Sequence, residues 1–310
     1  MILLCSCMPR SDASKTPLAA ETPYTFTDAL GRRYAQEEIP RRIVSLGPAI
    51  TEILFAIGAG DRVVGVTQYC DYPPEAKTRT IVGGFSGATV SMEQIRVLEP
   101  DLVILSADMH SRIVSLLDGL GISSFAVEPR SFSQIYETIS LIGEITGCGP
   151  GAEQVIAEMK GKIARAGERI QGRERPGVFW VLGEDPLMTV GAETFVSEAI
   201  TLGGGRNIFA DIREQWPLVS PEQVLLRKPD WILMGNDMAE SAGAAAPGTG
   251  TAMSGVGLLK GSFWQSIPAV REGRVAVLNG DILYRYGPRI ADAVVDIAEI
   301  LQPVYGTLVP

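Results

Sequence analysis

The chain has 310 residues, of which 46% are hydrophobic and 20% charged, so it is long enough to bury two cores. Its formal net charge of −9 leaves no basic stripe to replace phosphate counterions, which argues against a nucleic-acid partner. The only histidine, His110, cannot build a multi-histidine zinc or manganese site by itself, so we expect no metal site and no cofactor of the protein's own.

The first residues resemble a bacterial lipobox. MILLCSC places Leu4, Cys5 and Ser6 directly before Cys7, the cysteine that would be lipidated. Because the apolar run is short for a signal peptide, we interpret it as a truncated lipoprotein signal; the alternative is a disordered terminus. The following Ser-, Thr-, Pro- and Ala-rich stretch predicts a flexible tether, so 1–23 indicate a periplasmic or cell-surface protein held to the membrane through a lipid only.

Residues 24–148 are predicted to form an α/β lobe that begins with a β-hairpin. The hairpin is indicated by TFTDALGRRYAQEE, in which an Asp-Ala-Leu-Gly turn separates two short segments. Beyond it, buried-strand runs such as RIVSLG, RVVGVT and PDLVILS alternate with amphipathic stretches such as TEILFAIGAG. This alternation predicts a parallel sheet with helices on both faces.

The second half of the chain begins with a long helix. Apolar residues at intervals of three and four in GAEQVIAEMKGKIARAGERI predict one amphipathic helix over 149–172, roughly 30 Å long. The β/α alternation then restarts and fills 173–310. The predicted fold is therefore α/β, with two doubly wound Rossmann-like lobes joined by a single helix. Open α/β sheets bind ligands beyond the carboxyl ends of their strands, so the ligand cleft is expected between the lobes.

One helix–strand unit occurs twice, as VSMEQIRVLEPDLVIL and VSPEQVLLRKPDWILM, which start 129 positions apart (90 and 219). Both copies predict a helix that ends before Pro-Asp and is followed by a strand. Pro221 occupies the first helical position of the second copy, which proline favours. Capping boxes are predicted at both starts, from Ser91 with Gln94 and from Ser220 with Gln223.

Several motifs, taken in order, resemble those of a known family. The chain contains RIVSLGPAITEILFAIGAGDRVVGVTQYCDYPPEAK, EPDLVIL, GGGRNIF, WPLVSPEQVL, IPAVREGRVAVL and DILYRYGPRIADAV. Their sequence is similar to that of the helix-linked (class III) periplasmic substrate-binding proteins of ABC importers for cobalamin, ferric siderophores or haem. The resemblance implies a monomeric, non-enzymatic receptor that captures a cobalt or iron chelate and delivers it to a membrane permease dimer.

The resemblance also implies a role for the glutamate that each repeat carries. In the family, one exposed glutamate on each lobe docks into an arginine pocket of the permease, and by position these are Glu93 and Glu222. A carboxylate in the first helical turn is favourable in any case, by about 0.3–1 kcal/mol. That effect explains one glutamate but not an equivalent one on each lobe.

Loops after the strands supply the candidate ligand-binding residues. Aromatic faces suit a corrin, a porphyrin or an aromatic siderophore, and a guanidinium suits anionic oxygens. For any single tyrosine, the alternative is packing within its own lobe. The Pro-Pro that follows Tyr72 also allows a role in shaping its loop, and His110 is placed in the loop after DLVILS. The predicted lining is Tyr69, Tyr72, Phe85, His110, Trp216, Asp281, Tyr284, Arg285 and Tyr286.

The sequence leaves several alternatives open. The expected cargo is a cobalamin-type corrinoid or a ferric siderophore, and a haem receptor, with His110 or Tyr69 on the iron, is the alternative within the family. A two-lobed enzyme such as a glycosyltransferase is the other class, although no Gly-rich phosphate fingerprint follows a strand. Pairing of Cys70 with Cys148 stays open. The Ala/Gly-rich insertion at 239–257 is predicted to be disordered, or else to form a flap.

Overall fold

The computed structural model describes residues 24–237, 253–255 and 259–302. Cys7 and the rest of 1–23 therefore lie outside the described residues, as does most of the insertion at 239–257. Within the described ranges, no helix has the length and apolar character needed to cross a membrane.

The N-terminal lobe is built on a five-stranded parallel sheet with the strand order β5-β4-β3-β6-β7. Its strands are β3 (Ile43–Ser45), β4 (Val63–Val66), β5 (Thr80–Ile81), β6 (Leu102–Ser106) and β7 (Ser124–Val127). Its helices are α1 (Pro48–Ala56), α2 (Met92–Val97), α3 (Ala107–Gly119) and α4 (Phe132–Ile145). Short 3-10 turns lie at Gly60–Arg62, Pro74–Thr78 and Gly87–Thr89.

The C-terminal lobe repeats this plan in the order β11-β8-β12-β14-β13, with only the edge strand β13 antiparallel. Its sheet comprises β8 (Gly177–Val181), β11 (Arg206–Asn207), β12 (Trp231–Gly235), β13 (Met253–Ser254) and β14 (Val275–Leu278). A small hairpin joins β9 (Gly183–Glu184) to β10 (Leu187–Met188). The helices are α6 (Phe195–Leu202), α7 (Pro221–Arg227), α9 (Ser262–Ser266), α10 (Pro268–Arg271), α11 (Gly280–Leu283) and α12 (Ile290–Leu301).

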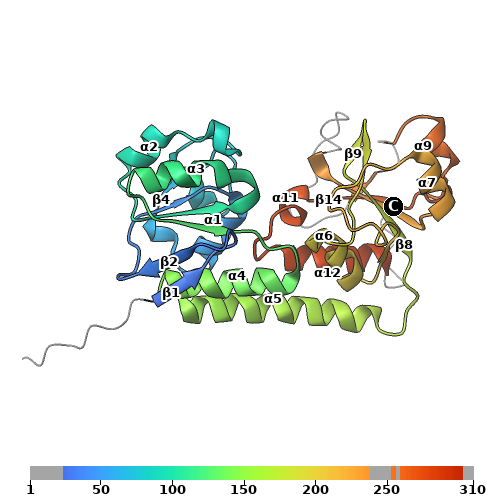
Figure 1. Ribbon diagram of the computed structural model, residues 1–310. Coiled ribbons are helices and arrows are strands. Elements are labelled where there is room, and N and C mark those ends of the chain that lie inside the picture. The colour runs from blue at the N-terminus through green and yellow to red at the C-terminus, as the bar shows by residue number, and fades with distance from the viewer. Residues whose placement is uncertain (1–23, 238–252, 256–258, 303–310) are drawn as a thin grey trace, which may run out of the picture.

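One long helix, α5 (Gly149–Ile170), runs along both lobes (Figure 1). Its buried face packs against α4 of the first lobe and α12 of the second. Ion pairs from Lys162 to Asp292 (2.6 Å) and from Arg169 to Glu299 (3.2 Å) join it to α12. The largest hydrophobic core is therefore continuous from one lobe to the other. These features confirm the predicted α/β fold of two lobes joined by one helix.

The leading hairpin consists of β1 (Tyr24–Thr27) and β2 (Arg33–Gln36). The side chain of Asp28 is buried in the turn, where it forms an ion pair with Arg32 at 2.7 Å and accepts from the backbone N–H of Leu30. The N–H of Ala29 donates to the carbonyl of Ala126 in β7. The Asp-Ala-Leu-Gly turn thus fixes the hairpin and also attaches it to the first sheet.

The two sequence repeats have matching structures, including their helix ends. Glu99 and Lys228 occupy equivalent positions, and they are the two non-glycine residues with positive φ (44° and 48°) in the described chain. The predicted capping box forms at Ser220 with Gln223. At Ser91 only half of the box forms: its hydroxyl accepts from Gln94, but its own N–H already donates to the carbonyl of Val82. The prediction of a full box there was wrong because a backbone hydrogen bond to the loop after β5 uses the donor.

Two cysteines and two tryptophans are buried or half-buried, and the cysteines answer the pairing question that the sequence left open. Cys70 is buried and Cys148 half-buried, and both are free thiols rather than partners in a disulfide. Trp180 is fully buried, while Trp231 is half-buried against the shared core.

Candidate ligand-binding cleft

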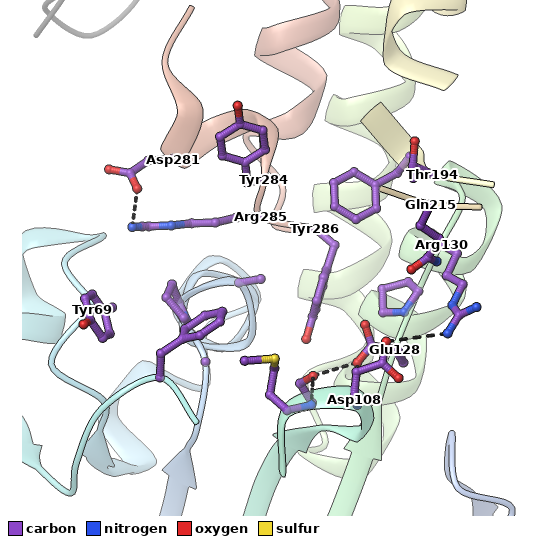
Figure 2. Close-up of a pocket in the computed structure, with 18 of the residues that line it drawn as sticks. Tyr69, Asp108, Glu128, Arg130, Thr194, Gln215, Asp281, Tyr284, Arg285 and Tyr286 are labelled. Carbon is purple, nitrogen blue, oxygen red and sulfur yellow. Dashed lines mark hydrogen bonds and ion pairs between the residues drawn. The ribbon is translucent and has the colours of Figure 1, made fainter. Parts of the chain in front are cut away.

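A cavity of about 520 Å³ lies between the two lobes, and both lobes line it (Figure 2). From the N-terminal lobe come the starts of α1 and α3 and the loops after β4 and β7. From the C-terminal lobe come the start of α6, the segment at Gln215 and Trp216, and α11 with the residues that follow it. The cavity thus lies beyond the carboxyl ends of parallel strands, where open α/β sheets bind ligands.

The structure brings eight of the nine predicted ligand-binding residues to this cavity. These eight are Tyr69, Phe85, His110, Trp216, Asp281, Tyr284, Arg285 and Tyr286. Tyr69 and Phe85 pack edge to face, with ring centroids 6.0 Å apart, and both are about half exposed. Trp216 is also partly exposed and lines the cavity from the other lobe. Aromatic surface is therefore available on both sides of a ligand.

Tyr72 is the predicted residue that does not line the cavity. Its ring instead covers the guanidinium of Arg289, whose central carbon lies 3.8 Å from the ring centroid. A tyrosine face in this position stabilises a cation through its negative quadrupole. Its placement in the cavity was wrong because the loop turns the ring toward an inter-lobe ion pair, which the sequence does not reveal.

Arg285 lies at the cavity wall with three carboxylates around it. Its Nη1 is 2.7 Å from Asp71 and 3.5 Å from Glu52, and its Nη2 is 2.6 Å from Asp281, a bond drawn in Figure 2. Asp71 and Glu52 belong to the other lobe, so this guanidinium bridges the lobes. Burial acts to raise the pKa of Asp71, but the hydrogen bond and charge of Arg285 outweigh it and lower that pKa.

Glu52 forms the centre of the contact between the lobes. Its side chain is 2% exposed and accepts two hydrogen bonds from Arg289, one of them from Nε at 2.9 Å. Burial raises the pKa of Glu52, while the hydrogen bonds and charges of Arg289 and Arg285 oppose that rise. Gly287 is required next to it, because a Cβ there would lie 2.7 Å from the Glu52 carboxylate. The glycine of the GPR motif thus makes room for this ion pair.

The wall that follows β6 and β7 carries polar residues that the sequence analysis did not select. Glu128 Oε2 accepts from the hydroxyl of Ser106 (2.6 Å) and from the N–H of Asp108 (3.1 Å). Arg130 lies 3.5 Å from the Asp108 carboxylate. Burial raises the pKa of Glu128 above its usual range. Tyr286 reaches toward this wall from the other lobe (Figure 2), and burial followed by the charges of Glu128 and Asp108 raises its pKa. The polar residues of this wall come directly after the buried strands β6 and β7, and that position was the sequence signal that could have identified them.

His110 was predicted to lie in a loop, but it lies in the first turns of α3. The hydroxyl of Ser106 accepts from the N–H of Met109 and so caps a helix that begins directly after β6 and leaves no loop there. The imidazole is buried, and neither ring nitrogen makes a hydrogen bond of normal geometry within the described part of the chain, although the backbone at Ser106 and Phe85 lies close enough to oppose the effect of burial on its pKa. Burial lowers the pKa of His110, so the ring is neutral at pH 7. A buried neutral imidazole at a cavity wall retains a lone pair.

The paired glutamates do not line the cavity and lie on the two equivalent helices. Glu93 is in the first turn of α2 and Glu222 in the first turn of α7, and both side chains are exposed. Figure 1 shows one helix on each lobe, on the side of the molecule away from α5. Each helix turns its buried residue, Ile95 or Val224, toward its own lobe.

The sequence model of the periplasmic binding protein family matches residues 43–282, which is more than half of the chain. The chain belongs to this family. As a periplasmic binding protein, it is 30% identical to the vitamin B12-binding protein of Photorhabdus laumondii subsp. laumondii, over 85% of this chain and 88% of that protein. It is also 30% identical to the uncharacterized ABC transporter substrate-binding lipoprotein YvrC of Bacillus subtilis, over 97% of this chain and 94% of that protein.

Solved structures of periplasmic binding proteins have the same two-lobed fold. The periplasmic heme-binding protein RhuT from Roseiflexus sp. RS-1, in its apo form, is 30% identical with a TM-score of 0.72, covering 84% of this chain and 98% of that one. The vitamin B12-binding protein BtuF of Vibrio cholerae is 29% identical with a TM-score of 0.69, and the match covers 84% of this chain and 96% of that one. The relatives of this periplasmic binding protein are thus binding proteins and not enzymes.

Proposed function

We propose that this protein captures a metal chelate in the cavity between its lobes and delivers it to the membrane permease of an ABC importer. The observation that carries the proposal is a cavity to which both lobes contribute aromatic side chains, Tyr69 and Phe85 from one and Trp216 from the other. Flat apolar faces on both sides suit a planar chelate. Relatives named for vitamin B12 and heme binding support the same class of ligand.

The charges of the cavity favour a chelate with a neutral rim. Both arginines of the described lining have carboxylate partners: Arg285 pairs with Asp281, and Arg130 with Asp108. Glu128 adds a further acidic group. An anionic ligand would have to displace these carboxylates and would then leave them without partners, which is costly in a half-buried site. A cobalamin-type corrinoid has an amide rim that donates and accepts hydrogen bonds, so it fits better than haem, with two carboxylates, or a polyanionic ferric siderophore.

Delivery is assigned to the exposed glutamates of the two lobes. Glu93 and Glu222 would each approach a basic group on one subunit of a permease dimer, because equivalent positions on two lobes match a partner with two equivalent subunits. We place the protein outside the cytoplasm as a monomer, tethered through a lipid on Cys7, in keeping with the relative named as a lipoprotein. No observation favours a glycosyltransferase, and no catalytic step is proposed.

Quenching of tryptophan fluorescence tests the ligand class. Trp216 lines the cavity, whereas Trp180 is fully buried behind it and packs edge to face against Tyr284 of the lining, with ring centroids 6.2 Å apart, so a bound chelate should quench Trp216 most strongly. We expect saturable quenching by cyanocobalamin, and at least tenfold weaker binding of haemin and of a ferric tris-catecholate. Trp216→Phe should reduce the quenching and leave the part that comes from Trp180, while calorimetry still detects binding. Tighter binding of haemin than of cyanocobalamin would overturn the assignment of a ligand with a neutral rim. Binding of none of the three would overturn the proposed function as a chelate receptor.

A further inference from the structure

Two apolar side chains stand out on the protein surface, and they occupy equivalent positions in the two repeats. Val97 is 72% exposed and Leu226 is 81% exposed, the highest values for any large hydrophobic side chain in the described chain. They are 129 positions apart, as are Glu93 and Glu222. The duplicated unit thus repeats an exposed apolar residue as well as an exposed acid.

The acid and the apolar residue of each repeat share one helix face. Val97 follows Glu93 by four positions within α2, and Leu226 follows Glu222 by four within α7. Residues four apart on a helix lie one above the other on the same side. We call these pairs the α2 patch (Glu93, Val97) and the α7 patch (Glu222, Leu226). The buried residues Ile95 and Val224 lie on the opposite side of their helices, so both patches face away from the cores.

Folding gives no reason for these apolar residues. A side chain that stays about three-quarters exposed gains little from burial, and a polar residue would serve the helix equally well. Single exposed hydrophobic residues are ordinary, but a matched pair beside a matched pair of acids indicates a shared partner surface. The two kinds of contact also differ in free energy, because burying a valine or leucine side chain contributes several times more to binding than an exposed ion pair does.

We propose that Val97 and Leu226 are the apolar anchors with which the protein binds the permease, each inserting into an apolar depression beside a basic group on one of the two permease subunits. The inference rests on the proposed function. In this arrangement the glutamates steer and orient the encounter, and the apolar residues supply most of the affinity. The repetition of the patch on both lobes identifies the partner as a dimer with two equivalent sites.

The two patches are not equal in apolar area. Leu218 is 63% exposed and Leu225 39% exposed in and just before α7, whereas the position equivalent to Leu225 in α2 is Arg96. Within the two helices, α7 therefore exposes two leucines where α2 exposes one valine. We expect the C-terminal lobe to contribute more of the affinity for the permease than the N-terminal lobe.

Binding of the full chain to its permease complex in lipid nanodiscs, without chelate, tests the proposal. Val97→Ser should weaken binding about tenfold, Leu226→Ser by more, and the double variant about a hundredfold. Leu116→Ser is the matched control, because Leu116 is a helical leucine that is 55% exposed outside both patches, and it should bind like the wild type. All variants should keep their response to cyanocobalamin, since none of these positions lines the cavity.

Salt separates the two kinds of contact. Between about 50 and 500 mM salt, the loss caused by Glu93→Gln with Glu222→Gln should shrink, because exposed charges become screened. The loss caused by the serine variants should persist. If the double serine variant binds within twofold of wild type while the glutamine variants lose affinity, the glutamates suffice and the inference is overturned with the proposed function intact. If the wild type fails to bind the permease, the proposed function itself is overturned.

Discussion

The buried carboxylate of Glu52 offers a sharp test of how the two lobes are held together. Glu52→Gln keeps the shape of the side chain and removes its charge, so it addresses the ion pairs with Arg289 and Arg285 and leaves the packing in place. The two guanidiniums are only 16% and 13% exposed, so neither is fully solvated when its partner is neutralised.

The structure sets the size of the expected effect. Breaking a buried ion pair by removing one partner costs about 3–5 kcal/mol. Here Arg285 keeps Asp71 and Asp281, and Arg289 keeps the ring of Tyr72. The glutamine oxygen can still accept one hydrogen bond. We therefore expect Glu52→Gln to lower the free energy of unfolding by about 2 kcal/mol, below the range for a fully isolated pair.

Urea unfolding followed by circular dichroism measures this change. With a slope near 3 kcal/mol/M, about 2 kcal/mol corresponds to a shift of roughly 0.7 M in the midpoint. Asp211→Asn is the control, because Asp211 pairs with Arg227 at 2.7 Å but is 62% exposed, and it should cost less than about 1 kcal/mol. If the two variants shifted the midpoint equally, the buried pairs of Glu52 would stabilise the protein no more than an exposed pair does, and the predicted extra cost would be refuted.

Two further predictions concern the connecting helix and the buried histidine. A Cβ at Gly151 would lie 2.2 Å from the carbonyl oxygen of Ile57, so Gly151→Ala should lower the free energy of unfolding in urea by about 1–3 kcal/mol. A Cβ at Gly161, on the same helix, would meet only Arg165 at 3.6 Å, so Gly161→Ala should raise that free energy by about 0.5–1 kcal/mol. A loss of stability at both positions would contradict this reasoning. The pKa of His110 is lowered from its ordinary 6.5 by burial, so the unfolded chain binds a proton more readily and stability falls as the pH drops below 6.5. His110→Leu should reduce that fall and raise the unfolding free energy at pH 7 by about 1 kcal/mol; an unchanged pH profile would show that the ring is solvated.

The glutamates and their neighbours illustrate what a duplicated sequence can and cannot reveal. Comparing the two copies identified the equivalent helices, their serine caps and the acids in their first turns. The exposure of Val97 and Leu226 could not be predicted from the two copies, because the apolar periodicity of a helix of six or seven residues does not define which face is buried. Only the packing of each helix on its own lobe decided which positions remain exposed.

The amino-acid sequence by itself determined the alternation of strands and helices, the connecting helix and eight residues of the cavity wall. Those features depend on local periodicity, on caps and on the rule that ligands bind beyond the carboxyl ends of parallel strands. The tertiary structure alone decided that Tyr72 covers Arg289 and that Glu128 joins the cavity wall. It also decided that Glu52 pairs with Arg289, 237 positions away. Such pairings join two different sheets. Their partners are set by how the two lobes meet along α5, and residues that are neighbours in the sequence carry no signal of that contact.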